Sequence, residues 1–279
     1  MPLALITGAS TGIGRATAVR LARAGWTVLA GVRDLAAAEG LGDGIIPLKL
    51  DVTDGEHIAA AAAAVRAQSG EASDGSGSLD ALVNNAGVGF GGPLEIVSSE
   101  DLLRQFEVNV FGQVAITQAL LPALRRASGR ILLVSSIGGR VATPYLAPYA
   151  ASKHAIEAIG DALRVELRSS GVQVALIEPG SVATPIWDKG RADAQRVSIP
   201  PALADYYGHI PAAMEKTLAD TARRAIPPER VAETIEGALG ARRMRARYLV
   251  GRDAKGALLA KRLLPDRVFD RVIQRTLGV

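Results

Sequence analysis

Short apolar runs recur along the chain and alternate with longer amphipathic stretches of helix length. Nearly every position in each run is apolar, which is typical of strands that are buried on both faces of a parallel sheet. The alternation predicts an α/β protein with a doubly wound parallel sheet and helices on both of its faces. The predicted strands are Leu3–Ile6, Thr27–Gly31, Ile46–Leu50, Ala81–Val83, Arg130–Val134 and Val172–Ile177.

The domain organisation follows from the same alternation. A chain of 279 residues has room for one or two domains. Ser69–Ser78 is the only low-complexity segment, and strands and helices alternate on both sides of it, so we expect a single domain over residues 1–279. Residues 186–226 carry apolar side chains between prolines and glycines, which is typical either of a lid over a substrate pocket or of packed helices.

Two of the predicted helices, 110–126 and 149–168, carry apolar or small residues on more than one side. A helix that is apolar on several sides is usually buried on several sides. Each helix is therefore either a central helix under two layers or part of a subunit interface. The apolar positions of the first helix include Val110, Phe111, Val114, Ile116, Leu120 and Leu121.

The composition excludes several kinds of chemistry. The chain has no cysteine, which rules out disulfides, a thiolate nucleophile, iron–sulfur clusters and cysteine-bound zinc. Its three histidines, His57, His154 and His209, lie far apart and lack the spacing of metal ligands, so we expect no metal site.

The positive charge belongs to the end of the chain. The net charge is +4, but residues 240–279 hold eleven Lys and Arg against three Asp, so the first 239 residues are net negative. We therefore expect no nucleic-acid partner. The N-terminus lacks a basic region followed by a long apolar stretch, and no segment has the ~20 apolar residues that span a bilayer. These features predict a cytoplasmic protein.

A glycine-rich turn follows the first predicted strand and opens a helical pattern. It reads Thr7-Gly8-Ala9-Ser10-Thr11-Gly12-Ile13-Gly14. Glycines at such positions let backbone N–H groups approach a pyrophosphate, and the dipole of the helix favours the same negative charge. A glycine-rich loop alone is often a plain turn, but one placed between a strand and a helix favours dinucleotide binding.

Polar residues gather where the predicted strands end. Ligands of open α/β sheets bind at the carboxyl ends of the strands, so we expect these residues to form one site. Each also has a plain explanation: a Tyr and a Lys four apart are often neighbours on a solvated helix face, and a Ser pair after a strand often caps a helix. The residues are Asp51, Asn84, Asn85, Ala86, Gly87, Asn109, Ser135, Ser136, Tyr149, Lys153 and residues 179–184.

These motifs, in this order, make residues 3–185 resemble the short-chain dehydrogenase/reductase family. The resemblance implies a Rossmann fold and hydride transfer between a nicotinamide and an alcohol or carbonyl. It also implies four catalytic residues, with Tyr149 as general acid or base and Ser136 as the group that orients the substrate oxygen. Lys153 would favour the tyrosinate and hold the nicotinamide ribose, and Asn109 would position a water beside it. Ser135 is the alternative to Ser136.

The resemblance further implies contacts with the cofactor. Asp51 and Val52 correspond to adenine contacts, although Asp51 by itself is an ordinary turn residue. Thr184 corresponds to the contact with the carboxamide. The full set of implied cofactor-binding residues is Gly8, Ser10, Thr11, Gly12, Ile13, Gly14, Arg33, Asp51, Val52, Asn85, Ala86, Gly87, Tyr149, Lys153, Pro179, Gly180, Val182 and Thr184.

The end of the second predicted strand bears on the choice of coenzyme. NAD-binding proteins commonly place an Asp or Glu there for the ribose 2′-hydroxyl, whereas an Arg can neutralise a 2′-phosphate. Val32 occupies the acidic position and Arg33 follows it, which favours NADP(H). NAD(H) stays open because Asp34 is only two residues away, and Arg33 can also be read as an exposed strand-end charge.

The favoured function is an NAD(P)-dependent oxidoreductase for a lipophilic alcohol or ketone, because the segments around Asn109 and Thr184 most resemble the steroid- and retinol-type branch of the family. The alternatives are a β-ketoacyl-thioester reductase with an acyl-carrier partner and a cofactor-binding regulator without turnover. The family resemblance also implies a homo-oligomer, a dimer or tetramer. The apolar residues of the predicted lid are Trp187, Ile199, Leu203, Tyr206, Tyr207, Ile210 and Met214.

The basic tail, residues 252–279, predicts two helices over Lys255–Leu264 and Pro265–Leu277. In the second, Val268, Phe269, Val272 and Ile273 share one face, and Arg267, Arg271 and Arg275 form a column at spacing four. Such a helix packs on the enzyme body, covers a neighbouring subunit or the substrate cleft, or lies on an anionic membrane surface.

Overall fold

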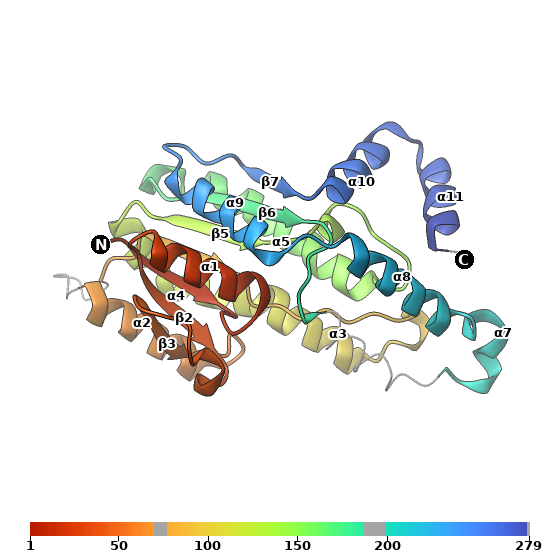
Figure 1. Cartoon of the computed structure of the whole chain (residues 1–279), viewed down its shortest axis with the longest axis horizontal. Helices are drawn as coiled ribbons and strands as arrows, with labels where there is room; N and C mark the ends of the chain where they lie inside the picture. The colour runs from red at the N-terminus through yellow and green to blue at the C-terminus, as the bar shows by residue number, and fades with distance from the viewer. Residues whose placement is uncertain (70–76, 187–198, 278–279) are drawn as a thin grey trace.

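The structure is a computed structural model that describes residues 1–69, 77–186 and 199–277. A seven-stranded sheet with the order β3-β2-β1-β4-β5-β6-β7 runs through the described residues, and every neighbouring pair is parallel (Figure 1). The six predicted strands and the doubly wound sheet are confirmed. The strands are β1 Leu3–Thr7, β2 Thr27–Val32, β3 Ile45–Lys49, β4 Ala81–Asn84, β5 Arg130–Val134, β6 Gln173–Pro179 and β7 Arg247–Val250.

The apolar pattern of the chain does not predict the seventh strand. β7 reads Arg-Tyr-Leu-Val inside the basic segment, and of its residues only Val250 is fully buried. An edge strand is covered less completely than a central one and so lacks a continuous apolar run. Its register on β6 pairs Tyr248 with Ile177 and Leu249 with Glu178, which brings the basic end of the chain beside a buried acid.

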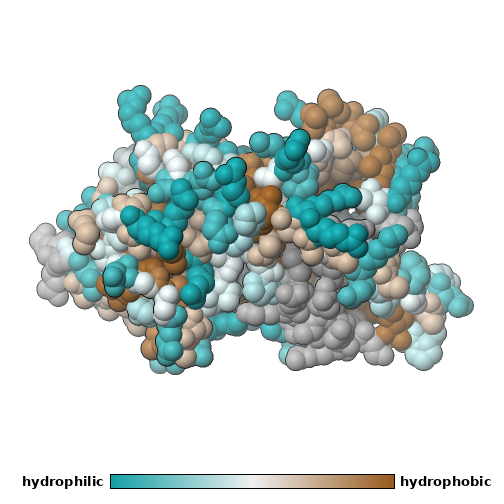
Figure 2. All heavy atoms as spheres, in the orientation of Figure 1, coloured by the Kyte–Doolittle hydropathy of each residue, from teal (hydrophilic) through white to brown (hydrophobic). Residues whose placement is uncertain are grey.

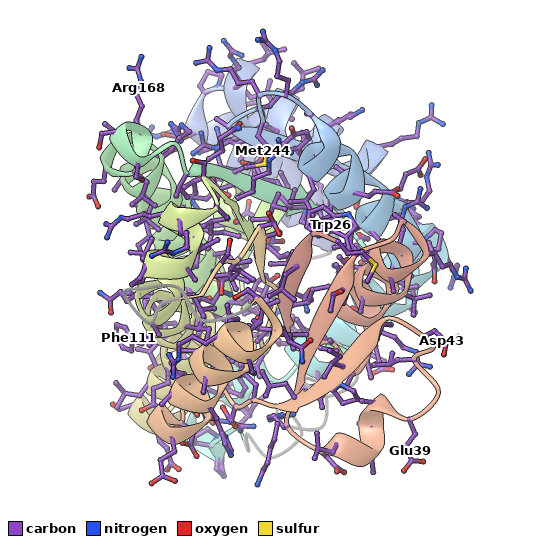
Figure 3. The ribbon with its side chains drawn as sticks, turned by 90° about the vertical axis from the view of Figure 1, so that its left-hand side faces the viewer. Trp26, Glu39, Asp43, Phe111, Arg168 and Met244 are labelled. Atoms are coloured by element: carbon purple, nitrogen blue, oxygen red, sulfur yellow. The ribbon has the colours of Figure 1, made fainter. Side chains whose placement is uncertain are left out.

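Two layers of helices cover the sheet, as the end-on view shows (Figure 3). Alternate residues of β1 face the two layers, because side chains alternate along a strand. Ala4 and Ile6 pack with the buried sides of α1 and α9, together with Trp26 and Met244. Leu3 and Leu5 pack with α2, α4 and α5. The helices of these layers are α1 Gly12–Arg23, α9 Pro228–Gly240, α2 Gly55–Ser69, α4 Gly112–Arg126 and α5 Ala147–Glu166.

The two helices that are apolar on several sides correspond to α4 and α5. Ile116 and Leu120 are fully buried, as expected for central helices. Phe111, in the π-helical turn Glu107–Phe111 (η3) before α4, is 58% exposed (Figure 3), and Val165 near the end of α5 is 70% exposed. The inner sides therefore form the core, and apolar side chains remain on the outer sides. The other short elements of this part are η1 Leu35–Ala38, η2 Leu94–Ile96, α3 Ser99–Phe106, η4 Ile137–Gly139 and η5 Arg168–Ser170.

The described part of the region predicted as a lid contains the short elements η6 Pro201–Leu203 and α7 Ala204–Tyr207, followed by the longer helix α8 Ile210–Arg224. Residues 187–198, with Trp187, lie outside the described residues. In α8 the Met214 methyl group lies 3.6 Å from the position that a Cβ on Gly91 would take. This helix therefore comes close to the loop after β4.

The tail forms two helices, α10 Arg252–Leu263 and α11 Asp266–Leu277, close to the predicted ranges. α11 lies against α8, and Phe269 is buried. Val268 and Val272 from the same predicted apolar face are exposed, so this face is only partly covered. Across the part of the chain that the structure describes, no helix has the length and apolar character to cross a membrane.

Candidate active site

The glycine-rich turn joins β1 to the first turn of α1. Gly8 and Gly12 have φ angles of +66° and +54°, a region that favours glycine. A Cβ on Gly14 would collide with the carbonyl oxygen of Gly8, so the turn closes only with glycine at this position. The first turn of α1 holds no acidic residue, and no side chain caps it. Its N–H groups can therefore receive a phosphate, and the implied contacts Ser10, Thr11 and Ile13 line the same turn.

The turn after β4 braces the glycine-rich turn. The Thr7 hydroxyl oxygen accepts hydrogen bonds from the backbone N–H groups of Asn85 and Ala86, both at 2.9 Å. The Asn85 side chain donates in return to the carbonyl oxygens of Thr7 at 2.9 Å and Gly8 at 3.1 Å. The Asn85 amide nitrogen therefore supports the loop, and Thr7 is a supporting residue that the implied cofactor contacts do not include.

The loop after β6 reaches the same place. A Cβ on Gly12 would lie 2.9 Å from the Thr184 methyl carbon, so Thr184 lies over the glycine-rich turn. Val182 is buried and forms a bridge with Ile226. The Asp253 carboxylate, from the first turn of α10, accepts the Ser181 N–H at 2.7 Å and fixes the loop that begins with Pro179 and Gly180. Sequence reasoning does not find Asp253, because it lies 72 residues away in the tail.

The two implied adenine contacts follow β3. The Asp51 carboxylate accepts the Thr53 N–H at 3.0 Å and the Thr53 hydroxyl at 2.8 Å, which is the geometry of a turn residue. Val52 is buried, and a Cβ on Gly112 would lie 2.6 Å from a methyl carbon of Val52. The structure thus gives both residues a structural role, and their contact with adenine stays a prediction.

An exposed arginine, Arg33, follows the end of β2. Val32 is the buried last residue of the strand, and Arg33 is exposed directly after it. The Asp34 carboxylate accepts the Ala36 N–H at 3.1 Å and so caps the 3₁₀ turn that follows. The acid that kept NAD(H) open is thus engaged in local structure.

Ser136 and Tyr149 form the centre of the predicted catalytic group. Ser136 follows β5 and accepts the Gly138 N–H at 3.0 Å, and its hydroxyl is hydrogen-bonded to that of Tyr149. Tyr149, in the first turn of α5, is 7% exposed. Burial raises the pKa of Tyr149, and the hydrogen bond from Ser136 lowers it by less. Ser135 instead faces Glu157, so the structure favours Ser136 over its alternative.

Lys153 lies one turn further along α5. Its Nζ donates to the Val134 carbonyl oxygen at 2.9 Å and lies 5.8 Å from the centre of the Tyr149 ring. Burial lowers the pKa of Lys153 to about 8, and the negative charge of Glu157 raises it. Burial is the larger influence on the pKa of Tyr149 here, and a Lys153 ammonium that favours the tyrosinate stays a prediction.

Asn109 lies in the π-helical turn and is fully buried. Its side chain pairs with the backbone of Val88, accepting the N–H at 2.8 Å and donating to the carbonyl oxygen at 3.0 Å. It also donates to the Ser152 hydroxyl at 3.0 Å, which itself donates to the Tyr149 carbonyl oxygen at 2.7 Å. Ser152 is a second supporting residue that sequence reasoning missed, although its place directly before Lys153 gives the signal.

Gly87 lies where two of the catalytic side chains meet. A Cβ on Gly87 would lie 3.3 Å from the Asn109 Oδ1 and 3.8 Å from the Lys153 Nζ. The structure thus brings Asn109, Ser136, Tyr149 and Lys153 together at the carboxyl ends of β4 and β5. Arg33 and Asp51 lie apart from them, at the ends of β2 and β3.

Comparisons with known proteins identify the family of the chain. The family model for short chain dehydrogenases matches residues 2–195. The chain is 36% identical to an NADPH-dependent 3-dehydrocapnine reductase of Ornithobacterium rhinotracheale, over 99% of this chain and 98% of that protein. It is also 36% identical to retinol dehydrogenase 5 of Mus musculus, over 96% and 86% of the two chains. A short-chain dehydrogenase from Burkholderia phymatum, solved in complex with NAD, has 30% identity and a TM-score of 0.74, with coverage of 93% and 91%.

The matches span nearly the whole chain, and the parallel sheet with helices on both faces agrees with this family, whose members act on alcohol and carbonyl groups. The chain therefore belongs to the short-chain dehydrogenase family of oxidoreductases.

Proposed function

We propose that this protein reduces a lipophilic ketone or aldehyde, or oxidises the matching alcohol, with NADP(H) as the favoured coenzyme. One observation carries the proposal: the hydrogen-bonded Ser136–Tyr149 pair is buried beside the Lys153 ammonium at the end of β5. These are the groups that a carbonyl reduction needs, a proton donor, a hydrogen bond to the carbonyl oxygen and a nearby cation. A bound nicotinamide supplies or accepts the hydride.

The high pKa of Tyr149 favours the reduction. A buried hydroxyl keeps its proton at neutral pH and can donate it to a carbonyl oxygen. Ser136 holds that oxygen in place, and Lys153, whose pKa is about 8, is charged at neutral pH and can return a proton to Tyr149. Asn109 holds the backbone beside Lys153, where it would position a water.

The coenzyme preference rests on the end of β2. Val32 offers no carboxylate to a ribose 2′-hydroxyl, and the exposed Arg33 guanidinium can pair with a 2′-phosphate. Asp34 is engaged by the Ala36 N–H. The NADPH dependence of the dehydrocapnine reductase agrees with this preference.

The substrate class rests on the apolar surroundings of the catalytic residues. Phe90 and Val141 are buried near the turns after β4 and β5. A Cβ on Gly91 would lie 2.7 Å from a methyl carbon of Leu146 and 3.6 Å from that of Met214, so α8 brings apolar atoms to this loop. Apolar surroundings of this kind suit a lipophilic substrate, and the 36% sequence identity with a retinol dehydrogenase points the same way.

A turnover assay tests the proposal. Ketosteroids, retinal, β-ketoacyl thioesters and small ketones are offered with NADPH and with NADH, and coenzyme oxidation is followed. We expect the highest kcat/KM for a steroid or retinoid with NADPH. A preference for carrier-linked thioesters would support the ketoacyl reductase instead, and the absence of single-turnover oxidation of bound NADPH by any carbonyl would indicate a regulator.

We also propose that the protein is a homo-oligomer, and that the tail packs on the enzyme body or a neighbouring subunit, with contact to an anionic membrane as the alternative. The exposed Phe111, directly before α4, and the exposed Val165 of α5 support the first idea, because exposed apolar side chains beside the core fit a subunit interface. Figure 2 shows apolar side chains gathered over α10 and α11 with polar ones around them, and Leu259, Leu263 and Val268 are exposed there. Apolar side chains among basic ones suit an anionic lipid surface.

A further inference from the structure

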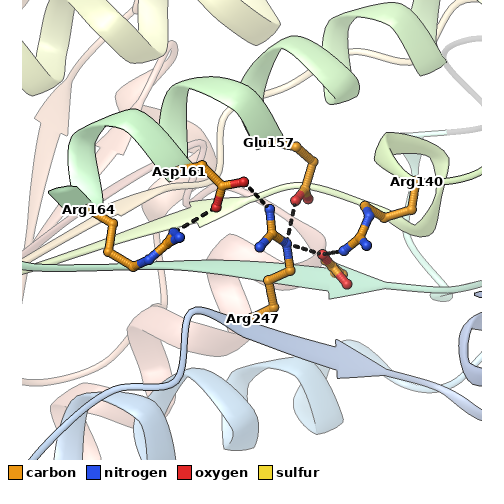
Figure 4. A network of polar contacts seen from close by, with 6 residues as sticks. Arg140, Glu157, Asp161, Arg164 and Arg247 are labelled. Atoms are coloured by element: carbon orange, nitrogen blue, oxygen red, sulfur yellow. Dashed lines mark hydrogen bonds and ion pairs between the residues drawn. The ribbon is translucent and has the colours of Figure 1, made fainter.

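A network of ion pairs begins one helical turn beyond Lys153. Tyr149, Lys153, Glu157 and Asp161 follow one another on α5 at spacing four, so the catalytic pair and two acids form one column on the same face of the helix. Figure 4 shows that the arginine of β7, Arg247, reaches into this column between the two acids.

The contacts of the network are short and partly buried. The Arg247 Nε lies 2.9 Å from a Glu157 oxygen and 3.1 Å from a Glu178 oxygen, and its terminal nitrogen lies 2.6 Å from Asp161. Arg140, just after η4, pairs with Glu178 at 3.0 Å. The side chains of Glu178 and Glu157 are only 1% and 7% exposed, whereas Asp161 is 43% exposed. The buried end of the network is thus the end nearest Lys153.

We propose that Glu157, held in place by Arg247, is a positioning residue that keeps the Lys153 ammonium charged and fixed beside Tyr149. The proposal rests on the function proposed above. It gives the edge strand β7 a role in the active site, because Arg247 of β7 contacts Glu157 of α5.

The position of the ion pairs beside Lys153 gives a reason for charges whose burial costs free energy. Buried ion pairs often stabilise a protein no better than apolar packing would, so a network of this kind is weak evidence for a role in stability alone. The Glu157 carboxylate accepts a hydrogen bond from the Arg247 guanidinium on one side and faces the Ser135 hydroxyl on another. The two neighbouring serines therefore have different partners: Ser135 faces Glu157, and Ser136 is hydrogen-bonded to Tyr149.

The charges around Lys153 agree with the proposal. Burial lowers the pKa of Lys153 to about 8 and the Glu157 charge raises it, so the carboxylate opposes the loss of the proton. Burial and the neighbouring Glu178 raise the pKa of Glu157, while Ser135 and Arg247 lower it. Arg247 therefore helps to keep Glu157 ionised, and Glu157 helps to keep Lys153 charged.

The pH profile of carbonyl reduction tests the proposal. In the native enzyme the rate is expected to fall in the alkaline range as Lys153 loses its proton, with an apparent pKa of about 8. Glu157→Gln removes the negative charge, so the pKa of Lys153 falls and the alkaline limb of kcat moves down by about one pH unit. KM for NADPH and for the substrate is expected to stay within about two-fold, because the Glu157 side chain is buried against Arg247 and is not among the implied cofactor contacts.

The matched control is Asp161→Asn, which removes another carboxylate partner of Arg247 two turns from Lys153. It is expected to leave the alkaline limb in place. A limb that is unchanged in Glu157→Gln, or that moves equally in both variants, overturns the proposal. Glu157→Asp keeps the charge on a shorter side chain and should show a smaller shift in the same direction.

If Glu157→Gln does not fold, the Glu157→Asp profile decides, and a native limb position in that variant overturns the proposal. The failure of the proposed function looks different. In that case the native protein itself shows no Tyr149-dependent turnover of any carbonyl, whatever the state of Glu157.

Discussion

The two ends of the proposed active site, the glycine-rich turn as its nucleotide end and the loop after β4 with α7 and α8 as its substrate end, are built in different ways. At the nucleotide end, Gly8, Gly14 and Asn85 bring backbone against backbone, and the turn closes only because side chains are missing. At the substrate end, side chains define the surface: Tyr207 of α7 donates to the Glu95 carboxylate at 2.6 Å, and Met214 approaches Gly91. The first end is therefore fixed by close packing and the second by the choice of side chain.

This difference predicts how each end responds to change. An added methyl group at the nucleotide end has no space, so it should affect coenzyme binding whatever the substrate. At the substrate end a changed side chain alters the surface that a substrate meets and leaves the sheet intact. Changes at the predicted catalytic residues should act mainly on the chemical step.

Tyr149→Phe should have the largest effect on turnover, and it should separate catalysis from coenzyme binding. It removes the proton donor and leaves the glycine-rich turn unchanged, so kcat should fall by about 10²–10⁴-fold. Fluorescence titration should show nearly native NADPH binding, and kcat is measured with the best carbonyl of the panel. Activity within a few-fold of the native enzyme would show that Tyr149 is not the acid.

Gly14→Ala should weaken the binding of both coenzymes at the glycine-rich turn. The new Cβ would collide with the Gly8 carbonyl oxygen and lie 2.5 Å from the Asn85 Nδ2. Overpacking of this kind costs about 1–3 kcal/mol, which corresponds to a loss of roughly 10-fold or more in affinity for both coenzymes. Titration with NADPH and NADH measures the loss.

The matched control is Gly237→Ala, a helical glycine of α9 whose Cβ would meet nothing within 4 Å. It should leave coenzyme binding unchanged and raise the thermal midpoint slightly, because alanine favours a helix over glycine. Equal losses in the two variants would contradict a special role for the glycine-rich turn.

The same contrast explains how much the sequence can predict. Gly12, Ser136 and Tyr149 are residue types whose chemistry or conformation is itself informative, and their order along the chain predicted the fold and the catalytic group. Arg247 and Asp253 carry no such signal. Their roles depend on pairing between the tail and segments about 70 to 90 residues away, Ser181 and Glu157, which no local pattern contains.

Arg33→Ala should distinguish the two coenzymes by their affinities. Only NADPH carries a 2′-phosphate, and a hydrogen bond to a charged group contributes roughly 1.5–3 kcal/mol. The Kd for NADPH should therefore rise by about 10-fold or more, while the Kd for NADH changes little. Arg23→Ala, an exposed arginine at the end of α1, is the control. Equal effects on both coenzymes would show that Arg33 is only a surface charge.

The tail should give the smallest effect, and it tests whether the substrate end extends to a membrane. Sedimentation with phosphatidylglycerol vesicles is expected to carry the protein down at low salt and much less at high salt, because the attraction between exposed charges is screened. Truncation after Leu264 removes α11 and should abolish the binding. Truncation after Gly251 is unsuitable, because it also removes Asp253 and thus the support of the Ser181 N–H.

Point variants separate lipid contact from subunit contact. The double variant Val268→Asn and Val272→Asn lowers the apolar exposure of α11, and Val165→Asn does the same on the outer side of α5. The double variant should weaken sedimentation by a few-fold and leave the oligomeric state unchanged, whereas Val165→Asn should do the reverse. If the native protein ignores anionic vesicles at low salt, or if the double variant dissociates the oligomer, α11 covers a neighbouring subunit and does not lie on a membrane.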